Sequence, residues 1–502
     1  MSTGSIVRRP RAGSPRDWIA RIGLDRHGAS SLQAQLREAI VRAIAAGTLS
    51  PSARMPSTRE LAARLAIARN TATLAYRALA ADGWLLAAPR AGHVVNPALA
   101  ARPEPVGWRR EAGGGPIDWR ARLAHAAGSM PQVAKPRDGL AYPYPFVYGE
   151  FDPAMFPLRA WREAARMSLR PQAVRRWASD RIDADDPELV AQIALHLLPR
   201  RGIQATPDRI LVTLGAQQAM AAVAAALARP ALVVGLESPG YPDAWNTWSF
   251  FGARTLALPL DDAGLVVSAR LAGCRVVQVS PSHQNPTTTT MPQARRRALL
   301  RAAVEHDLLI VEDDYDSELA FDGRANAAIK AMDEDDRVIY IGSLSKTLAP
   351  GLRLGFLVGA PALVAEARAV RRLMLRHPPA NNQRALAHLL AMGHYETLQR
   401  RLQRTLAQRA HALSDALERH LPQVRFARPT GGSALWARAP RGTDMDAVAR
   451  RALARGVVFD PGAVFWRGVA RPPREWFRLG YASIPRERIE AGVAELARAF
   501  AG

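Results

Sequence analysis

Apolar residues in the first hundred positions recur at helical spacing. They predict a first helix that ends at Gly47. Its apolar face is formed by Leu32, Leu36, Ile40 and Ile44. A second helix is predicted in "PSTRELAARL", where Ser57 and Glu60 have the spacing of a capping box. Two short strands are predicted in "WLLAAPRAGHVV".

A third helix is predicted directly after a tight turn at residues 66–69. It covers residues 70–81, and Leu74 and Leu79 are expected to face the core. Together, these elements indicate a compact helical domain with a short β tip at residues 30–97.

Downstream of residue 140, short apolar runs alternate with helical stretches. This alternation predicts an α/β domain with a mostly parallel, seven-stranded sheet covered on both faces. The predicted strands are residues 209–215, 231–238, 254–260, 275–281, 308–314, 338–343 and 352–359. Ligands of such sheets bind at the carboxyl ends of the strands.

The chain is expected to have two domains joined by a linker. Residues 1–29 form a basic tail, and residues 98–139 are rich in proline, glycine and arginine, as is typical of a linker. The second domain covers residues 140–502, with a large part at about 180–400 and a smaller α+β part at about 401–502.

Composition favours a globular protein with an anionic partner. The 502 residues are 48% hydrophobic and 23% charged. The first 90 residues carry 14 arginines and five acidic residues, which suits double-stranded DNA. The single cysteine, Cys274, excludes an internal disulfide and a cysteine-rich metal site, so no metal is expected. No secretory signal or membrane span is recognisable, so the cytoplasm is expected.

Lysine is rare in this arginine-rich chain: only Lys135, Lys330 and Lys346 occur. Lys346 stands in "YIGSLSKTLAPGLRLGF", just after a predicted strand. A primary amine forms an imine with an aldehyde, whereas a guanidinium does not. The hypothesis is that Lys346 holds pyridoxal phosphate as a Schiff base; the alternative is an ordinary surface lysine.

Several residues near the predicted strand ends match the groups that bind pyridoxal phosphate. Its phosphate needs backbone N–H groups at a helix start, hydroxyls and a guanidinium. The candidates for these contacts are Gly215, Ala216, Gln217, Ser343, Ser345 and Arg353.

The remaining groups of the cofactor need a carboxylate, two donors and a flat partner. Asp313 ends an apolar strand, where it could keep the pyridine nitrogen protonated. Tyr315 and Asn285 could donate to the phenolic oxygen, and Tyr241 could cover the ring face. Arg478 could clamp the carboxylate of an amino acid. An acidic run after a strand could also bind metal or lie in a solvated turn.

The segments "TLGAQQ", "ESPGYP", "HQNPTT", "VEDDYDSEL", "GSLSKTLAPGLRLGF" and "FRLGYAS" resemble the signatures of fold-type I, class I/II aminotransferases. The resemblance covers about residues 140–500. It implies that Lys346 bears the cofactor and that Asp313 pairs with the pyridine nitrogen. It also implies that Asn285 and Tyr315 contact the phenolic oxygen, Arg353 binds the phosphate and Arg478 anchors a carboxylate.

The segment "MPSTRELAARLAIARNTATLAYRALAADGWL" is similar to the winged helix-turn-helix of GntR-type regulators. The third helix would enter the major groove with its N-terminal residues foremost. The predicted DNA contacts are Arg59, Arg64, Arg69, Asn70, Thr71, Thr73, Arg90 and His93. Ala66 and Ala68 stand where the family usually has glycine and serine; a lost serine cap typically costs about 1 kcal/mol. A small helical docking module is the alternative.

The combination resembles the MocR group of transcriptional regulators. It implies a homodimer, often head-to-tail, that binds a DNA operator and senses an amine or amino acid by forming an external aldimine on the cofactor. A second hypothesis is that pyridoxal phosphate itself is the signal. The alternative function is a working aminotransferase that retains a DNA-binding appendage, since the sequence carries all the expected cofactor residues.

Overall fold

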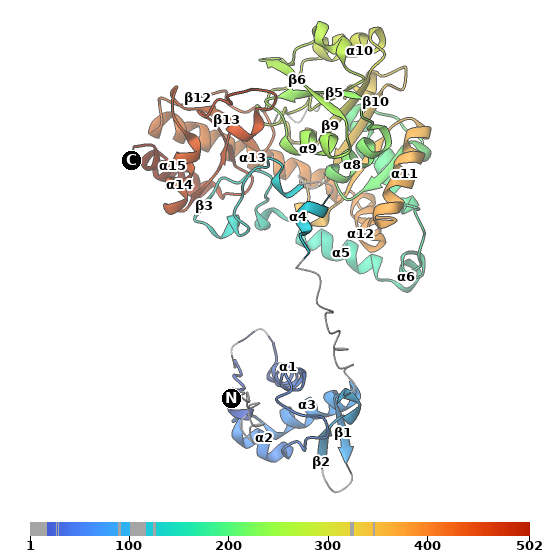
Figure 1. Ribbon diagram of the computed structural model, residues 1–502, viewed down its shortest axis with the longest axis vertical. Coiled ribbons are helices and arrows are strands. Elements are labelled where there is room, and N and C mark those ends of the chain that lie inside the picture. The colour runs from blue at the N-terminus through green and yellow to red at the C-terminus, as the bar shows by residue number, and fades with distance from the viewer. Residues whose placement is uncertain are drawn as a thin grey trace, which may run out of the picture. The chain divides into compact units, whose positions relative to one another are not determined.

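The computed structural model describes residues 18–26, 28, 30–88, 92–100, 117–123, 127–321, 326–344 and 347–501. It divides into two compact units, Met1–Arg122 and Leu123–Gly502 (Figure 1). None of the described helices combines the length and apolar character that crossing a membrane requires.

The first unit is a three-helix domain with a hairpin. Its elements are α1 (Leu32–Ala45), α2 (Thr58–Arg64), α3 (Arg69–Ala81), β1 (Leu85–Ala88) and β2 (Gly92–Val95), and a short helix, α4 (Trp119–Arg122), ends it. Ser57 caps α2, because its hydroxyl accepts from the backbone N–H of Glu60 at 3.1 Å. Trp18 and Ile19 precede α1 and are buried in the same core.

The core of this unit corrects one prediction. Leu79 is buried, but Leu74 is 39% exposed. The helix instead packs Ala72, Ala75 and Tyr76 into the core beside Leu79. In an alanine-rich helix several faces look apolar in sequence, so periodicity alone placed Leu74 on the wrong face.

The second unit is built on an eight-stranded sheet in the order β4-β11-β10-β9-β8-β5-β6-β7. The strands are β4 (Ile210–Thr213), β5 (Val233–Ser238), β6 (Arg254–Asp261), β7 (Gly264–Leu265), β8 (Val276–Val279), β9 (Leu309–Asp314), β10 (Val338–Ser343) and β11 (Gly355–Val358). The seven predicted strands are present, and β7 is an additional two-residue edge strand. The pairs from β6 to β10 are parallel, and β11 runs antiparallel to both of its neighbours.

Successive residues of the strands enter different cores, as expected for a sheet covered on both faces. On β4, Leu211 packs in one core, and Ile210 and Val212 pack in another. The first core contains α8 (Ala216–Leu227), α9 (Pro242–Phe250) and α11 (Pro361–Leu375). The opposite face packs against α10 (Gln293–Glu305) and α12 (Ala380–Ala391).

A smaller four-stranded sheet forms the C-terminal part, next to the 27-residue helix α13 (His394–His420) (Figure 1). The remaining elements of the unit are α5 (Leu158–Ser168), α6 (Pro171–Trp177), α7 (Pro187–Gln192), α14 (Met445–Ala454), α15 (Arg486–Ala501), β3 (Tyr144–Pro145), β12 (Arg425–Phe426), β13 (Ala434–Arg438), β14 (Val457–Val458), β15 (Asp460–Pro461) and β16 (Trp476–Gly480).

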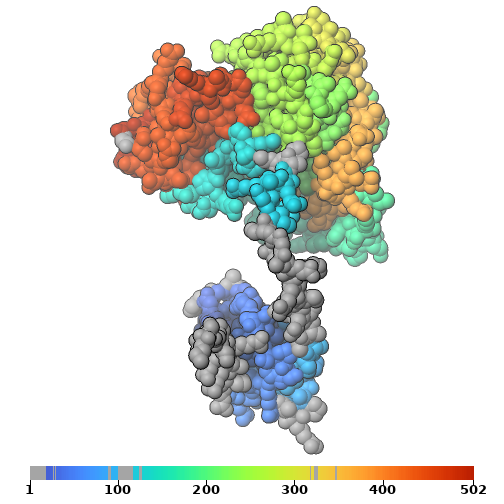
Figure 2. Space-filling view, viewed as in Figure 1, coloured from blue at the N-terminus to red at the C-terminus, as the bar shows by residue number. Residues whose placement is uncertain are grey.

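The segment around residues 142–150 joins the two parts of this unit. Its strand β3 pairs in parallel with β14 of the C-terminal part. Tyr148 and Gly149, a few residues on, line a cavity at the ends of the central strands. Figure 2 shows this cyan segment between the red C-terminal part and the green β/α part.

Candidate functional site

A cavity of about 170 Å³ lies at the carboxyl ends of the central strands. It brings together most of the predicted cofactor residues: Ala216, Gln217, Tyr241, Asn285, Asp313, Tyr315, Ser343 and Arg353. The predicted Lys346 and Ser345 lie outside the described residues. This is the position at which ligands of parallel sheets bind.

The cavity also has lining residues that the sequence did not single out: Tyr148, Gly149, Met220 and Pro350. Met220 follows Ala216 by one helical turn, so the predicted start of the helix could have placed it. Tyr148 and Gly149 are distant in sequence from every motif. The pairing of β3 with β14 and the hydrogen bonds of Ser483 to Pro145 and Val147 bring their segment to the site.

The turn between β4 and α8 brings a glycine and a guanidinium to the start of the helix. Gly215 precedes α8 with φ +80°, and a Cβ on Gly355 would stand 2.8 Å from the Gly215 Cα. Only glycine permits that approach of two backbones. Arg353, itself at φ +50°, donates from Nη2 to the carbonyl of Leu214 at 3.0 Å, which holds its guanidinium beside the start of the helix.

Asp313 is the member of the acidic run that lines the cavity. Its neighbours are engaged elsewhere: Glu312 accepts from the backbone N–H groups of Ile329 and Lys330. Asp314 accepts from Tyr340. Burial raises the pKa of Glu312 to about 7. A buried carboxylate that lines the cavity at this position suits a pyridinium nitrogen.

The two predicted phenolate donors have partners within the protein. The hydroxyl of Tyr315 donates to the carbonyl of His283 at 2.7 Å, and burial raises its pKa well above the usual value. The carbonyl oxygen of the Asn285 side chain accepts from Arg478 at 2.8 Å. Tyr241 donates to Asp243 at 3.2 Å, and its ring lines the cavity. The donor set therefore fits pyridoxal phosphate: a helix start and guanidinium, a carboxylate, an amide and two phenols.

Arg478 does not line the cavity, but it contacts two residues that do, Tyr148 and Asn285. Its Cζ lies 3.8 Å from the ring centroid of Tyr148 and 4.6 Å from that of Phe465. Its Nε and Nη2 donate to one oxygen of Asp460, at 3.1 and 2.9 Å. The side chains of both charged partners are at most 3% exposed.

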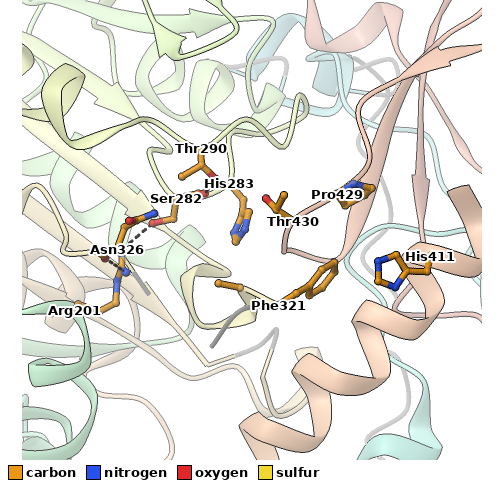
Figure 3. Close-up of a pocket in the computed structure, with 10 residues that line it drawn as sticks. Arg201, Ser282, His283, Thr290, Phe321, Asn326, His411, Pro429 and Thr430 are labelled. Carbon is orange, nitrogen blue, oxygen red and sulfur yellow. Dashed lines mark hydrogen bonds between the residues drawn. The ribbon is translucent and has the colours of Figure 1, made fainter. Parts of the chain in front are cut away.

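A second, larger cavity of about 470 Å³ is lined by Ser282, His283 and Thr290 (Figure 3). These residues belong to the loop between β8 and α10, which also carries Asn285. Arg201 donates from Nη2 to Ser282 at 2.8 Å and from Nε to Asp314 at 2.7 Å. The Nδ1 of His283 lies 3.1 Å from Asp316. These contacts hold the loop that carries Asn285.

In the first unit, most of the predicted DNA contacts are accessible. Arg59, Arg64, Arg69 and Asn70 are exposed, and Thr71, Thr73 and His93 are half-buried. Thr73 donates to the carbonyl of Arg69, and His93 packs edge-on against Tyr76 at 5.1 Å. Arg90 lies outside the described residues.

The turn before α3 has an unusual conformation for its residues. Ala66 adopts φ +50°, which favours glycine, and Ala68 provides no side-chain cap to α3. Arg26 donates from Nη2 to the carbonyl of Ala66 at 2.6 Å. This bond from the segment before α1 supports a turn that its own sequence supports poorly.

Comparisons with known proteins identify both units. Residues 150–496 match the family described as aminotransferase class I and II, and residues 32–95 match the bacterial regulatory proteins of the gntR family. The chain is 42% identical, over 88% of its length and 90% of the relative's, to the HTH-type transcriptional regulator TauR of Rhodobacter capsulatus. It is 32% identical, over 87% and 88%, to the "Probable rhizopine catabolism regulatory protein MocR" of Rhizobium meliloti.

The solved structures point to the same fold for the second unit. An α-aminoadipate aminotransferase of Thermus thermophilus, complexed with N-(5'-phosphopyridoxyl)-L-leucine, is 30% identical with a TM-score of 0.70. It covers 77% of this chain, and the match includes 99% of its own.

Proposed function

Because the chain belongs to the MocR-type transcriptional regulators, we propose that it senses a primary amine or amino acid at its bound cofactor and changes its affinity for a DNA operator in response. It is a DNA-binding regulator with a GntR-type unit, and pyridoxal phosphate is its cofactor. When bound, this cofactor supplies an aldehyde carbon that reacts with primary amines.

The observation that carries the proposal is the union of two sites in one chain. The first unit presents exposed arginines on a helix-turn-helix, and the second brings eight of the predicted cofactor residues to one cavity. Neither site alone explains the other's presence. A regulator whose ligand is an amine uses both.

We assign the residues of the cavity to the cofactor as follows. Gly215, Ala216, Gln217, Ser343, Ser345 and Arg353 hold the phosphate, and Lys346 bears the cofactor. Asp313 keeps the pyridine nitrogen protonated, Asn285 and Tyr315 contact the phenolic oxygen, and Tyr241 covers the ring. An amino-acid effector would bring its carboxylate toward Arg478.

In the first unit, α3 enters the major groove. The proposed contacts are Arg59, Arg64, Arg69, Asn70, Thr71, Thr73, Arg90 and His93. Arg59 and Arg64, in α2, contact DNA phosphates and supply affinity that depends on salt. Residues at the start of α3 contact the bases.

A homodimer, arranged head-to-tail, is part of the proposal. Leu373 is 80% exposed and Ile182 is 58% exposed. The loop that carries Ile182 is tied to the end of α11 by the ion pair of Asp180 with Arg376. Exposed apolar side chains of this size favour burial against another surface, and a second copy is the proposed one. Leu373→Glu is expected to shift the mass in analytical ultracentrifugation toward the monomer, whereas Val304→Glu, at an exposed position on α10, leaves it unchanged.

The working aminotransferase remains the second candidate, favoured by the likeness to the Thermus enzyme and by the predicted cofactor residues that line the cavity. Mixing the cofactor-loaded chain with amino donors separates the two. A regulator changes the absorbance of its cofactor and its operator binding without sustained release of keto acid. Sustained release of keto acid with no effect on operator binding identifies an enzyme.

A further inference from the structure

The charge of Arg478 is already matched inside the protein. Arg478 on β16 and Asp460 on β15 are directly opposite residues of an antiparallel pair. Both are buried, and Asn285 accepts a further bond from the guanidinium. Three of its N–H groups are therefore engaged, so the group keeps donors for a neutral acceptor, but its positive charge is compensated.

A ligand carboxylate at this position would be a second anion beside Asp460. Two carboxylates around one buried guanidinium leave a net negative charge in a site of low polarity, which is unfavourable. The rings of Tyr148 and Phe465 cover the guanidinium, so little solvent is available to screen that charge.

No other described cation lining the cofactor cavity takes over this role. Arg353 lines the cavity but is held at the phosphate turn. Lys135 lines a separate cavity and donates from Nζ to the carbonyl of Tyr148. The residue as a whole is exposed, yet its Nζ is partly buried, and that burial lowers the pKa of the amine.

We propose that Asp460 makes the effector pocket selective for primary amines that carry no carboxylate on the carbon bearing the amino group. A hydroxyl or another neutral acceptor on such an amine can use the spare N–H groups of Arg478 without bringing a second negative charge. The inference rests on the proposed amine-sensing function and narrows its effector class.

Matched pairs that differ only in the carboxylate test this selectivity. The full-length, cofactor-loaded chain is titrated with ethanolamine and L-serine, tyramine and L-tyrosine, and cadaverine and L-lysine. The absorbance of the bound cofactor reports binding. In the wild type, each amine is expected to half-saturate the change at a concentration at least about tenfold below that of its amino acid, since a like charge in a poorly screened site easily costs this much.

Asp460→Asn removes the charge and keeps the shape of the side chain. It is expected to tighten the binding of the three amino acids by about tenfold and to change that of the amines much less. Asp262→Asn, at an exposed turn, is the matched control and is expected to change neither. If the Asp460 variant does not fold, the preference of the wild type across the three pairs decides alone.

The outcomes separate this inference from the function on which it rests. Tighter binding of the amino acids by the wild type overturns the inference and leaves amine sensing intact. An unchanged preference in a folded Asp460→Asn chain also overturns it. A cofactor-loaded chain that responds to neither member of any pair overturns both the inference and amine sensing.

Discussion

Glu237 shows how strongly burial near the cofactor cavity shifts the pKa of a single carboxyl group. It is the second-last residue of β5, where one carboxyl oxygen accepts from the backbone N–H of Ser280 at 3.3 Å and from Gln284 at 3.1 Å. Burial, with a smaller contribution from the nearby Asp313, raises its pKa from 4.5 to about 8. At neutral pH the group is therefore mostly a neutral acid, which spares the Asp313 carboxylate a second buried charge.

The pH dependence of stability tests this state of Glu237. The native chain keeps a proton that the unfolded chain loses between pH 4.5 and about 8, so the stability that this group contributes falls as the pH rises through that window. Glu237→Gln cannot ionise. Its stability relative to the wild type is expected to rise from pH 5 to pH 8.5 by on the order of a few kcal/mol. Calorimetric melting temperatures at both pH values measure it, and a constant difference would show that Glu237 is ionised throughout.

The residues that line the cofactor cavity could largely be predicted from the sequence, but the hydrogen bonds of Arg478 with Asp460 could not. Asp313 lies near the end of β9, and Tyr315 and Asn285 follow β9 and β8; the carboxyl ends of parallel strands meet at one edge. The pairing of Arg478 with Asp460 depends on the register of two antiparallel strands, one of which is only two residues long. No local pattern in the sequence specifies that register.

Among the elements, Arg201 joins the segment before β4 to the end of β9 through a buried charge pair with Asp314, and it also donates to Ser282 in the loop from β8 to α10. The Nε of Arg201 donates to Asp314 at 2.7 Å, and their side chains are 2% and 0% exposed. A buried pair of this kind is costly to break, because the remaining charge has no partner.

Arg201→Met is therefore expected to destabilise the second unit by about 3–5 kcal/mol. Adding Asp314→Asn removes the uncompensated charge and is expected to recover part of that loss. Denaturant titrations of the single and double variants measure the difference. A single variant as stable as the wild type contradicts the buried charge pair.

The helix-turn-helix offers an opposite case, in which one substitution should stabilise. The strands of the sheet and the capped helix α2 could be predicted from the sequence. The hydrogen bond from Arg26 to the Ala66 carbonyl could not, because it joins residues 40 positions apart. Left-handed backbone costs a non-glycine residue about 1–2 kcal/mol, part of which glycine relieves.

Ala66→Gly is expected to stabilise the first unit by up to about 1 kcal/mol. Ala63→Gly, inside α2, is the matched control and is expected to destabilise by a similar amount. Hydrogen exchange of α2 and α3 in the full-length chain reads both effects. Faster exchange in Ala66→Gly contradicts the strained turn.

At the scale of the whole molecule, DNA binding and cofactor binding belong to different units. The first unit is basic and presents a helix-turn-helix, and the second carries the cofactor site of an aminotransferase fold. Composition and motifs predicted that division. Any coupling between the cofactor and operator binding could not be predicted, because no motif in the sequence encodes it.

The most direct test measures operator binding by the cofactor-loaded chain with and without a primary amine, in the wild type and in Lys346→Ala. The operator is first selected from random DNA with the wild type. The amine is expected to change the affinity of the wild type by about tenfold, within the usual range of allosteric coupling, and to leave Lys346→Ala unchanged. Lys346→Ala is also expected to lose the visible absorbance of the bound cofactor. An equal response of both proteins, or no response of the wild type, would contradict a cofactor-based switch.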